Sequence, residues 1–271
     1  MSIAGEVGWK TIKIKGTHQE SVSEVIATEF PLTLMLDGYE FATIVCSPGE
    51  LEDLVVGFLA SEGVIRTVAE IKDIQVDLYT GFAHIALHKS VQPDQFDHSS
   101  RLIGSCCGKS RQFYFKNDAR VAKTITSRLE VTVHQCMQLM KKLMDSSPEF
   151  KRTGGVHNAS LATSTEVLLT RSDIGRHNAL DKIFGAMLRD KISAKEKLVV
   201  FSGRISSEVL LKTSKMGIGI ILSKSAVTDL AVKLADELGI TVIGFVRDDR
   251  MNIYTRPDRV HGIHPHLQTD L

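Results

Sequence analysis

Cysteine is scarce in this sequence: its 271 residues include only four, Cys46, Cys106, Cys107 and Cys136. They are too few and too scattered to stabilise a chain of this size through disulfides, which favours a thiol-reducing compartment. Long apolar runs are missing too. Residues 1–16 lack the stretch that a secretory signal requires, and runs such as 218–222 are too short to cross a bilayer. We therefore expect a cytoplasmic protein without a membrane segment.

The sequence also has almost no net charge. Its 33 Lys and Arg residues are balanced by 32 Asp and Glu residues, which leaves a formal charge of +1. No overall field draws the chain to nucleic acid or to an anionic membrane, so we expect neither as a partner. A hydrophobic share of 43% beside 24% charged residues is typical of an ordinary folded protein. Any bound anion must therefore be held by a local cluster of charges.

Residues 1–124 are predicted to form a β-rich α+β domain. Alternating or continuous apolar residues indicate strands at 11–14, 32–36, 42–45 and 82–87. One helix interrupts them, because Ser47 and Glu50 have the spacing of a capping box with a proline between them. Apolar residues then recur at helical spacing over 51–59, and Gly63 is the expected helix end.

Residues 125–271 are predicted to form an α/β domain. A helix near 131–144 is followed by apolar strands that alternate with amphipathic helices. The strands are expected at 167–169, 198–201, 218–222 and 240–245, and the helices at 180–188, 206–216 and 227–238. This alternation favours a mainly parallel sheet covered on both faces. Gly217 and Gly239 stand where the last two helices should end.

The loops that follow these strands combine small or hydroxyl residues with cations. They are residues 171–177, 201–204, 223–225 and 245–250. Ligands of open α/β sheets bind at the carboxyl ends of the strands, where loop amides and helix N-termini converge. Amides and guanidiniums suit phosphate oxygens, so we predict a phosphate-bearing ligand. The alternative is that Gly and Ser only permit tight turns, and that the cations are solvated rim charges.

The adjacent Cys106 and Cys107 lie between glycines in a polar segment without periodicity, where we expect a mobile loop with exposed thiols. The nearby Lys109 would favour a thiolate. Adjacent cysteines close only a strained ring, so we expect one to carry sulfur or to attack while the other assists. The alternative is a pair of small apolar residues in a loop that folds inward. Cys46 and Cys136 fall in strand and helix patterns and are expected to be buried.

No catalytic or structural metal is expected. His157 follows a glycine-rich turn before an apparent short helix, where it could shuttle a proton, contact a ligand or simply hydrogen-bond its own turn. Zinc deaminases pair H-x-E with P-C-x-x-C, whereas Ala159 stands two residues after His157 and no C-x-x-C follows. The histidines at 261, 264 and 266 are expected to be solvated.

Five segments carry a recognisable combination of motifs. They are 47–63 (SPGELEDLVVGFLASEG), 153–159 (TGGVHNA), 172–182 (SDIGRHNALDK), 201–215 (FSGRISSEVLLKTSK) and 243–255 (IGFVRDDRMNIYT). In this order they resemble the formate dehydrogenase accessory sulfurtransferase family, FdhD, over nearly the whole chain. The resemblance implies an α/β fold class, with a cytidine-deaminase-like three-layer C-terminal domain that lacks the deaminase zinc and a smaller β-rich N-terminal domain.

The same resemblance implies a function and partners. Such proteins accept sulfur from a cysteine desulfurase as a cysteine persulfide. They deliver it to the bis-pterin guanine dinucleotide cofactor of formate dehydrogenase, which contains molybdenum or tungsten. The molybdenum form is molybdenum bis(molybdopterin guanine dinucleotide). A homodimer is implied as well. The predicted polyanion would then be this cofactor, whose two pyrophosphates would occupy the cationic loops.

Site residues are implied by matching the motifs position by position. The family's C-G-x-C-G pattern places Gly104 at its first cysteine and Cys107 at its second, while Cys106 occupies the variable position. Cys107 is therefore the favoured carrier thiol and Cys106 the alternative. The cofactor-contacting segment falls on Phe245, Val246, Arg247, Asp248, Asp249 and Arg250, assisted by Ser202, Gly203 and Arg204 and by Gly175, Arg176 and His177.

Two rival functions remain open. One is a cofactor chaperone that holds the pterin dinucleotide for formate dehydrogenase while its cysteines are dispensable. The other is a divergent hydrolase or deaminase of the same fold, which would contain zinc and turn over a free base or nucleotide.

Overall fold

The computed structural model describes residues 6–89, 102–103 and 124–262, and its chain divides into two compact units. The first unit comprises Met1–Tyr114, Ser147–Asn158 and Arg171–Ile192, and the second comprises Phe115–Ser146, Ala159–Thr170 and Ser193–Leu271. The sequence analysis instead predicts consecutive domains, 1–124 and 125–271. The physical reason for the difference is helix α5 (Arg176–Arg189), which packs along α1 (Leu51–Ser61) and so joins the first unit.

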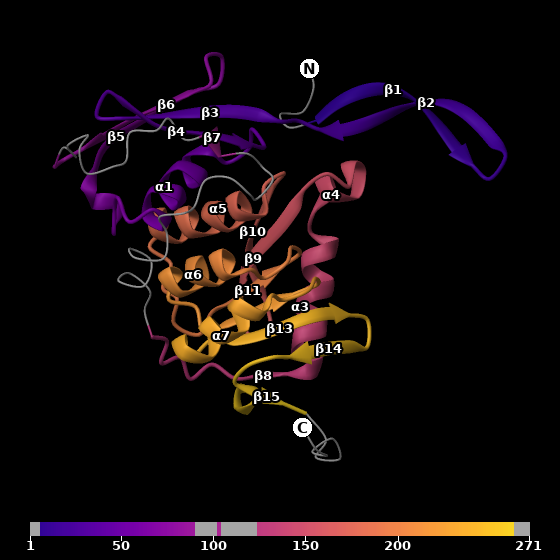
Figure 1. Cartoon of the computed structure of the whole chain (residues 1–271), viewed down its shortest axis with the longest axis vertical. Helices are drawn as coiled ribbons and strands as arrows, with labels where there is room; N and C mark the ends of the chain where they lie inside the picture. The colour runs from indigo at the N-terminus through magenta and orange to yellow at the C-terminus, as the bar shows by residue number, and fades with distance from the viewer. Residues whose placement is uncertain (1–5, 90–101, 104–123, 263–271) are drawn as a thin grey trace. The chain divides into compact units, whose positions relative to one another are not determined.

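The main sheet of the first unit has five strands in the order β5-β6-β3-β4-β7 (Figure 1). They are β3 (Phe30–Leu36), β4 (Tyr39–Cys46), β5 (Ile71–Asp77), β6 (Phe82–Leu87) and β7 (Leu102–Ile103). Strand β3 runs antiparallel to β4 and parallel to β6. Leu32, Leu34 and Leu36 alternate with less buried residues, as expected of a sheet with one covered face. The strands predicted at 32–36, 42–45 and 82–87 are confirmed.

A separate two-stranded ribbon belongs to the same unit. Strands β1 (Glu6–Lys15) and β2 (His18–Ala27) pair antiparallel along their whole length, joined by a two-residue turn with Gly16 at φ 63°. The strand predicted at 11–14 lies within β1. Near its base, β2 contacts the short helix α4 (Pro148–Thr153).

Helices α1 and α5 pack closely against each other at two glycines, one on each helix. A Cβ added at Gly57 would overlap the backbone carbonyl of Asp181, and a Cβ added at Gly185 would overlap the backbone carbonyl of Asp53. Each glycine therefore lets the other helix come close, which a larger side chain would prevent.

The predicted start of α1 is wrong in one respect. Its N-cap is Glu50, in a left-handed conformation with φ 46° and without a side-chain cap, rather than Ser47. The Ser47 hydroxyl instead accepts a hydrogen bond from the backbone N–H of Ile174, at 3.1 Å. The predicted end is confirmed, because Gly63 has φ 76° and directly follows the C-cap residue.

The larger sheet has six strands in the order β10-β9-β11-β12-β13-β14. They are β9 (His157–Ala162), β10 (Val167–Asp173), β11 (Leu198–Phe201), β12 (Ile220–Ser223), β13 (Thr241–Arg247) and β14 (Arg250–Ile253). The predicted parallel arrangement is confirmed for β11, β12 and β13. It does not extend further, because β9 and β14 pair antiparallel with β11 and β13.

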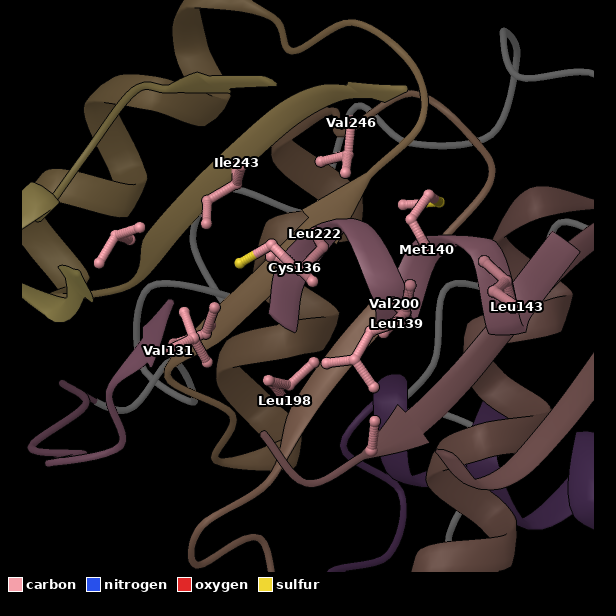
Figure 2. Packing of buried hydrophobic residues seen from close by; sticks show 13 residues of the cluster. Val131, Cys136, Leu139, Met140, Leu143, Leu198, Val200, Leu222, Ile243 and Val246 are labelled. Atoms are coloured by element: carbon pink, nitrogen blue, oxygen red, sulfur yellow. The ribbon is translucent and has the colours of Figure 1, made fainter. Parts of the chain in front are cut away.

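Helices cover both faces of the parallel strands. Helix α3 (Val133–Asp145) starts with a capping box between Thr132 and Gln135 and packs on β11, β12 and β13, close to the prediction of 131–144. Figure 2 shows Cys136 and Leu139 among strand residues such as Val200 and Ile243. The buried residues of opposite parity, such as Val199, face the other side, where the crossover helices α6 (Ser207–Met216) and α7 (Asp229–Leu238) pass.

The remaining regular elements are short. Strand β8 (Val131–Thr132) pairs parallel with β15 (Val260–His261), and single 3₁₀ turns span Val68–Glu70 and Pro257–Arg259. Within the described ranges, no helix is long and apolar enough to span a bilayer. The mixed α/β class is thus confirmed, and the cytidine-deaminase-like arrangement stays a prediction.

Candidate functional site

In the second unit, the loops after β11 and β12 are joined by hydrogen bonds. The Ser223 hydroxyl donates to the Gly203 carbonyl at 2.6 Å, and the Ser225 hydroxyl donates to the Ser202 carbonyl at 2.9 Å. Ile205 forms a parallel bridge with Val227 just beyond them. The two loops therefore form one rim at the carboxyl ends of the parallel strands. The hydroxyls of Ser223 and Ser225 hold this rim together.

The loop after β13 is attached to the same rim. The backbone N–H of Phe245 donates to the Ser225 carbonyl at 3.1 Å, and Nε of Arg247 donates to the Lys224 carbonyl at 3.2 Å. The register between β13 and β14 shifts between Gly244 and Arg247, and Phe245 has φ 52°. Such an irregularity bends a strand and re-aims its side chains, and bulges of this kind are over-represented next to active sites.

Two cations of the rim take no part in holding the described part of the fold together. Arg204 and Arg250 are exposed and form no ion pair or hydrogen bond through their side chains with any residue in the described ranges. Lys224 is half-buried and Arg247 is exposed. Two carboxylates, at positions 248 and 249, partly offset these charges. The excess of positive charge suits an anion with several oxygens.

A groove of about 600 Å³ adjoins the rim. Residues of α3, including Met137 and Met144, line it together with Lys224, Val246 and Arg247. Its volume lies in the range of about 300–1,000 Å³ that is usual for small-molecule sites. Val246 itself is fully buried and belongs to the hydrophobic cluster of Figure 2. Within the segment 245–250, this residue therefore contributes to core packing.

The predicted loop Gly175, Arg176 and His177 belongs to the first unit, at the start of α5. A buried carboxylate fixes this start. Asp173 accepts hydrogen bonds from the backbone N–H of Gly175 at 2.8 Å and from the Asn178 side chain at 2.9 Å, through the same oxygen. Its other oxygen lies 2.8 Å from Nζ of Lys182, and neither side chain is exposed. The loop is thus held in place by charge and hydrogen bonds.

Arg176 and two histidines share this end of the first unit. The Nε atom of Arg176 is buried and has no hydrogen-bond partner among the described residues. Burial lowers the pKa of His157, and the neighbouring Arg176 and His177 lower it further. His157 is therefore neutral at pH 7 and available as a donor or acceptor. It begins strand β9, so the short helix predicted after it is wrong: helix α4 precedes the turn instead.

With this geometry established, comparisons with known proteins identify the family. The sequence model of the FdhD/NarQ family matches residues 27–261. This chain belongs to the FdhD/NarQ family. A Geobacillus kaustophilus relative is 56% identical over 87% of this chain and 89% of its own length, and a Bacillus subtilis relative is 52% identical over 88% and 91%. Both are named sulfur carrier protein FdhD.

The solved structures give the same fold. One is the crystal structure of a protein from Desulfotalea psychrophila that is described as a candidate formate dehydrogenase accessory protein. The match covers 94% of this chain and 99% of the Desulfotalea chain, with a TM-score of 0.77. Its sequence is 24% identical, so this likeness concerns the fold alone.

The cysteines of this FdhD/NarQ family member divide into two groups. Cys46 and Cys136 are fully buried, as predicted, and burial is the main cause that raises the pKa of each thiol to about 12. Neither is a nucleophile at neutral pH. Cys106 and Cys107 lie outside the described residues, so their assignment as carrier thiols stays a prediction. Within the described ranges, no three His, Cys, Asp or Glu side chains are grouped to hold a metal.

The sequence analysis missed the network around Asp173. Besides Lys182 and Asn178, it includes the backbone N–H of Ser47, which donates to Asp173 at 3.0 Å across 126 positions of the chain. A signal was present, since an Asp before a helix and a Lys within the helix both stand in the segment quoted for the family resemblance. Their pairing depends on the fold, which local spacing does not reveal.

Proposed function

We propose that this chain is a sulfur carrier that serves formate dehydrogenase through a cysteine persulfide. One observation carries the proposal: close relatives are named sulfur carrier proteins, and the chain has only two cysteines that could perform this chemistry. Cys46 and Cys136 are excluded by burial and by pKa values of about 12. This leaves Cys106 and Cys107, with Cys107 favoured by the family motif.

In the first step, the carrier thiolate attacks the outer sulfur of a persulfide on a cysteine desulfurase. A new sulfur–sulfur bond forms on this chain, the donor's sulfur–sulfur bond breaks, and the donor cysteine leaves as a thiolate. In the second step, the acceptor supplies an electron pair to the outer sulfur, and the carrier cysteine leaves as a thiolate. No net electron is lost from the carrier over the cycle.

The acceptor in this proposal is the metal centre of the bis-pterin guanine dinucleotide cofactor, which is a substrate here. The residues present fit such a ligand, because Arg204, Lys224, Arg247 and Arg250 offer positive charge on a rim without ion pairs to described residues. Gly175, Arg176 and His177 offer further donors in the first unit, including the buried Nε of Arg176. This chain's contribution is to bind the phosphates and to position the sulfur.

Single Cys106→Ala and Cys107→Ala variants and the double variant, expressed in a strain without the native protein, test the proposal by formate dehydrogenase activity. We expect Cys107→Ala to lose most activity and the double variant to lose all of it. Cys136→Ala is the matched control, because it removes a thiol that is buried. Full activity in the double variant would contradict sulfur transfer and leave the cofactor chaperone, which requires guanine nucleotide binding without sulfur on the protein.

A further inference from the structure

The groove that adjoins the rim, which we call the α3 groove, lies within the second unit. Helix α3 contributes His134, Met137, Lys141 and Met144 to its lining. These positions follow one another at intervals of three, four and three residues. Residues at this spacing share one face of a helix, so they form a continuous stripe along α3.

The packing of α3 on its sheet does not account for the methionines of this stripe. Figure 2 shows Leu139 and Leu143, which face the sheet, in the buried cluster. Met137 and Met144 are half-buried and do not belong to that cluster of described residues. The outer face of a surface helix ordinarily carries polar side chains. Apolar residues placed there in a row indicate a surface that another molecule covers.

Methionine favours a peptide as the molecule that covers the groove. Its side chain is unbranched and polarisable, and methionine is frequent on surfaces that adapt to helical peptides. A purine or pterin ring, by contrast, usually stacks on an aromatic side chain. The described lining of the α3 groove contains no Phe, Tyr or Trp. A planar heterocycle therefore fits this groove less well than a peptide does.

The charges of the lining favour an acidic partner. Lys141, Lys224 and Arg247 are cations, and Asp248 is the one carboxylate among the described lining residues, which leaves an excess of two positive charges. The side chains of Lys141 and Lys224 form no ion pair or hydrogen bond with any residue in the described ranges. Carboxylates of a partner can therefore pair with them without breaking an existing contact.

The length of the stripe suits a helix. Met144 lies ten positions after His134 on α3, which corresponds to a rise of about 15 Å, or nearly three helical turns. A partner helix with apolar residues at positions i, i+3, i+4 and i+7 presents a stripe of similar length. Glutamates beside that stripe would face the cations of the groove.

We propose that the α3 groove is a docking site for an acidic amphipathic helix of a partner protein. Met137 and Met144 contact the apolar stripe of that helix, and Lys141 pairs with its carboxylates. Lys224 and Arg247 belong to both the groove and the rim, so the partner docks beside the proposed phosphate site. The docking site does not depend on sulfur carriage, so either proposal can fail without the other.

Fluorescence anisotropy of labelled synthetic peptides, titrated with the full chain, tests the proposal. The probe has about 18 residues, enough to form a helix, with leucines along one side and glutamate and glutamine elsewhere. One control peptide replaces each glutamate by lysine. A second keeps the composition but spreads the leucines around the helix. We expect both controls to bind at least about tenfold more weakly than the probe.

Variants of the chain assign the binding to the groove. Met137→Gln/Met144→Gln keeps side-chain length and helix propensity, and it should weaken binding of the acidic peptide about tenfold through lost apolar contact. Lys141→Gln should weaken it about threefold, with a difference that shrinks as salt is added. Leu230→Gln and Lys233→Gln are the matched controls, because both residues are exposed on helix α7, and they should leave the affinity unchanged.

Three results would overturn the proposal. They are equal affinity for the acidic and basic peptides, an acidic-peptide affinity that both groove variants leave unchanged, and an equal loss in the α7 controls. Melting temperatures close to that of the native chain establish that the variants are folded.

Two other occupants predict different results, and either result would also contradict the proposal. If the methionine variant weakens binding of guanosine diphosphate but not of the peptide, the groove holds a heterocycle. If it changes the mass in analytical ultracentrifugation but not the peptide affinity, the groove contacts a second copy of the chain.

Discussion

The buried ion pair of the first unit and the rim of the second unit use charge in opposite ways. In the first, the Lys182 ammonium and the Asp173 carboxylate are fully buried and 2.8 Å apart. In the second, Arg204 stands exposed on the rim without an ion-pair partner among the described residues. A buried charge must be paired and hydrogen-bonded, because its transfer from water costs several kcal/mol. An exposed and unpaired cation costs little and is available to a ligand.

This difference separates residues that hold the fold from residues that could bind. Asp53 illustrates the first kind, because it pairs at 2.8 Å with Arg171 and at 2.6 Å with Arg189 and is itself buried. The rim residues are joined mainly by serine hydroxyls and backbone groups, which leaves their cations outward. Substitutions should therefore affect stability at the buried ion pairs of the first unit and binding at the rim of the second.

The largest effect is expected from Lys182→Met, which leaves the Asp173 carboxylate buried without its counter-ion. We expect the free energy of unfolding to fall by about 3–5 kcal/mol in urea denaturation. The control is Lys233→Met, which removes an exposed pair with Asp229 at 3.9 Å and should cost less than about 0.5 kcal/mol. Equal losses in the two variants would contradict the account of the buried pair.

Gly57→Ala should have the next largest effect, because the added Cβ has to displace the α5 backbone at Asp181. Overpacking of this kind typically costs about 1–3 kcal/mol, and here we expect the upper part of that range. Gly49→Ala is the control, since a Cβ there meets no atom within 4 Å. Thermal unfolding of the two variants compares them, and a Gly57→Ala protein as stable as the native one would refute the close crossing.

Arg204→Ser should change binding rather than stability. Loss of one exposed guanidinium contact is expected to weaken binding of guanosine diphosphate, the probe, about fivefold, which corresponds to about 1 kcal/mol. Titration calorimetry at fixed salt measures the affinity, and the melting temperature should stay unchanged. Lys233→Ser provides a matched removal of an exposed cation away from the rim. If both variants bind equally well, the rim is not the phosphate site.

The smallest effect concerns the buried thiol of Cys136, whose pKa burial raises from 9.0 to about 12. The folded state holds this proton more tightly than the unfolded state, so the stabilisation is complete below pH 9 and is lost as the pH rises toward 12. Between pH 9 and pH 10, the native protein should lose about 1 kcal/mol more than Cys136→Ala. Parallel curves of unfolding free energy against pH would contradict this.

The sequence was sufficient to predict elements that have a local pattern. It was not sufficient for features that depend on residues distant in the chain. Continuous apolar runs predicted β11 and β13 because a strand buried on both faces must be apolar throughout. Strand β9 was missed, since Asn158 and Ser160 are polar yet buried, and a polar run resembles a loop.

The candidate site shows the same limit. The loops after β11, β12 and β13 were predicted to share an edge because they follow parallel strands, whereas the loop 171–177 belongs to the first unit. The role of Ser47 was misread, because its local spacing fits a capping box while its actual partner is Ile174, far along the chain. From the sequence, Ser223 and Ser225 had only a place in loops that present amides and cations or make tight turns, and their hydrogen bonds show that they join the loops.

The most direct test of sulfur carriage is intact-mass spectrometry of the protein after incubation with a cysteine desulfurase and cysteine, followed by peptide mapping. We predict a mass gain of one sulfur that reductant reverses and that maps to the peptide containing Cys106 and Cys107, with none on Cys46 or Cys136. No gain with a competent donor, or a gain on either buried cysteine, would contradict the account.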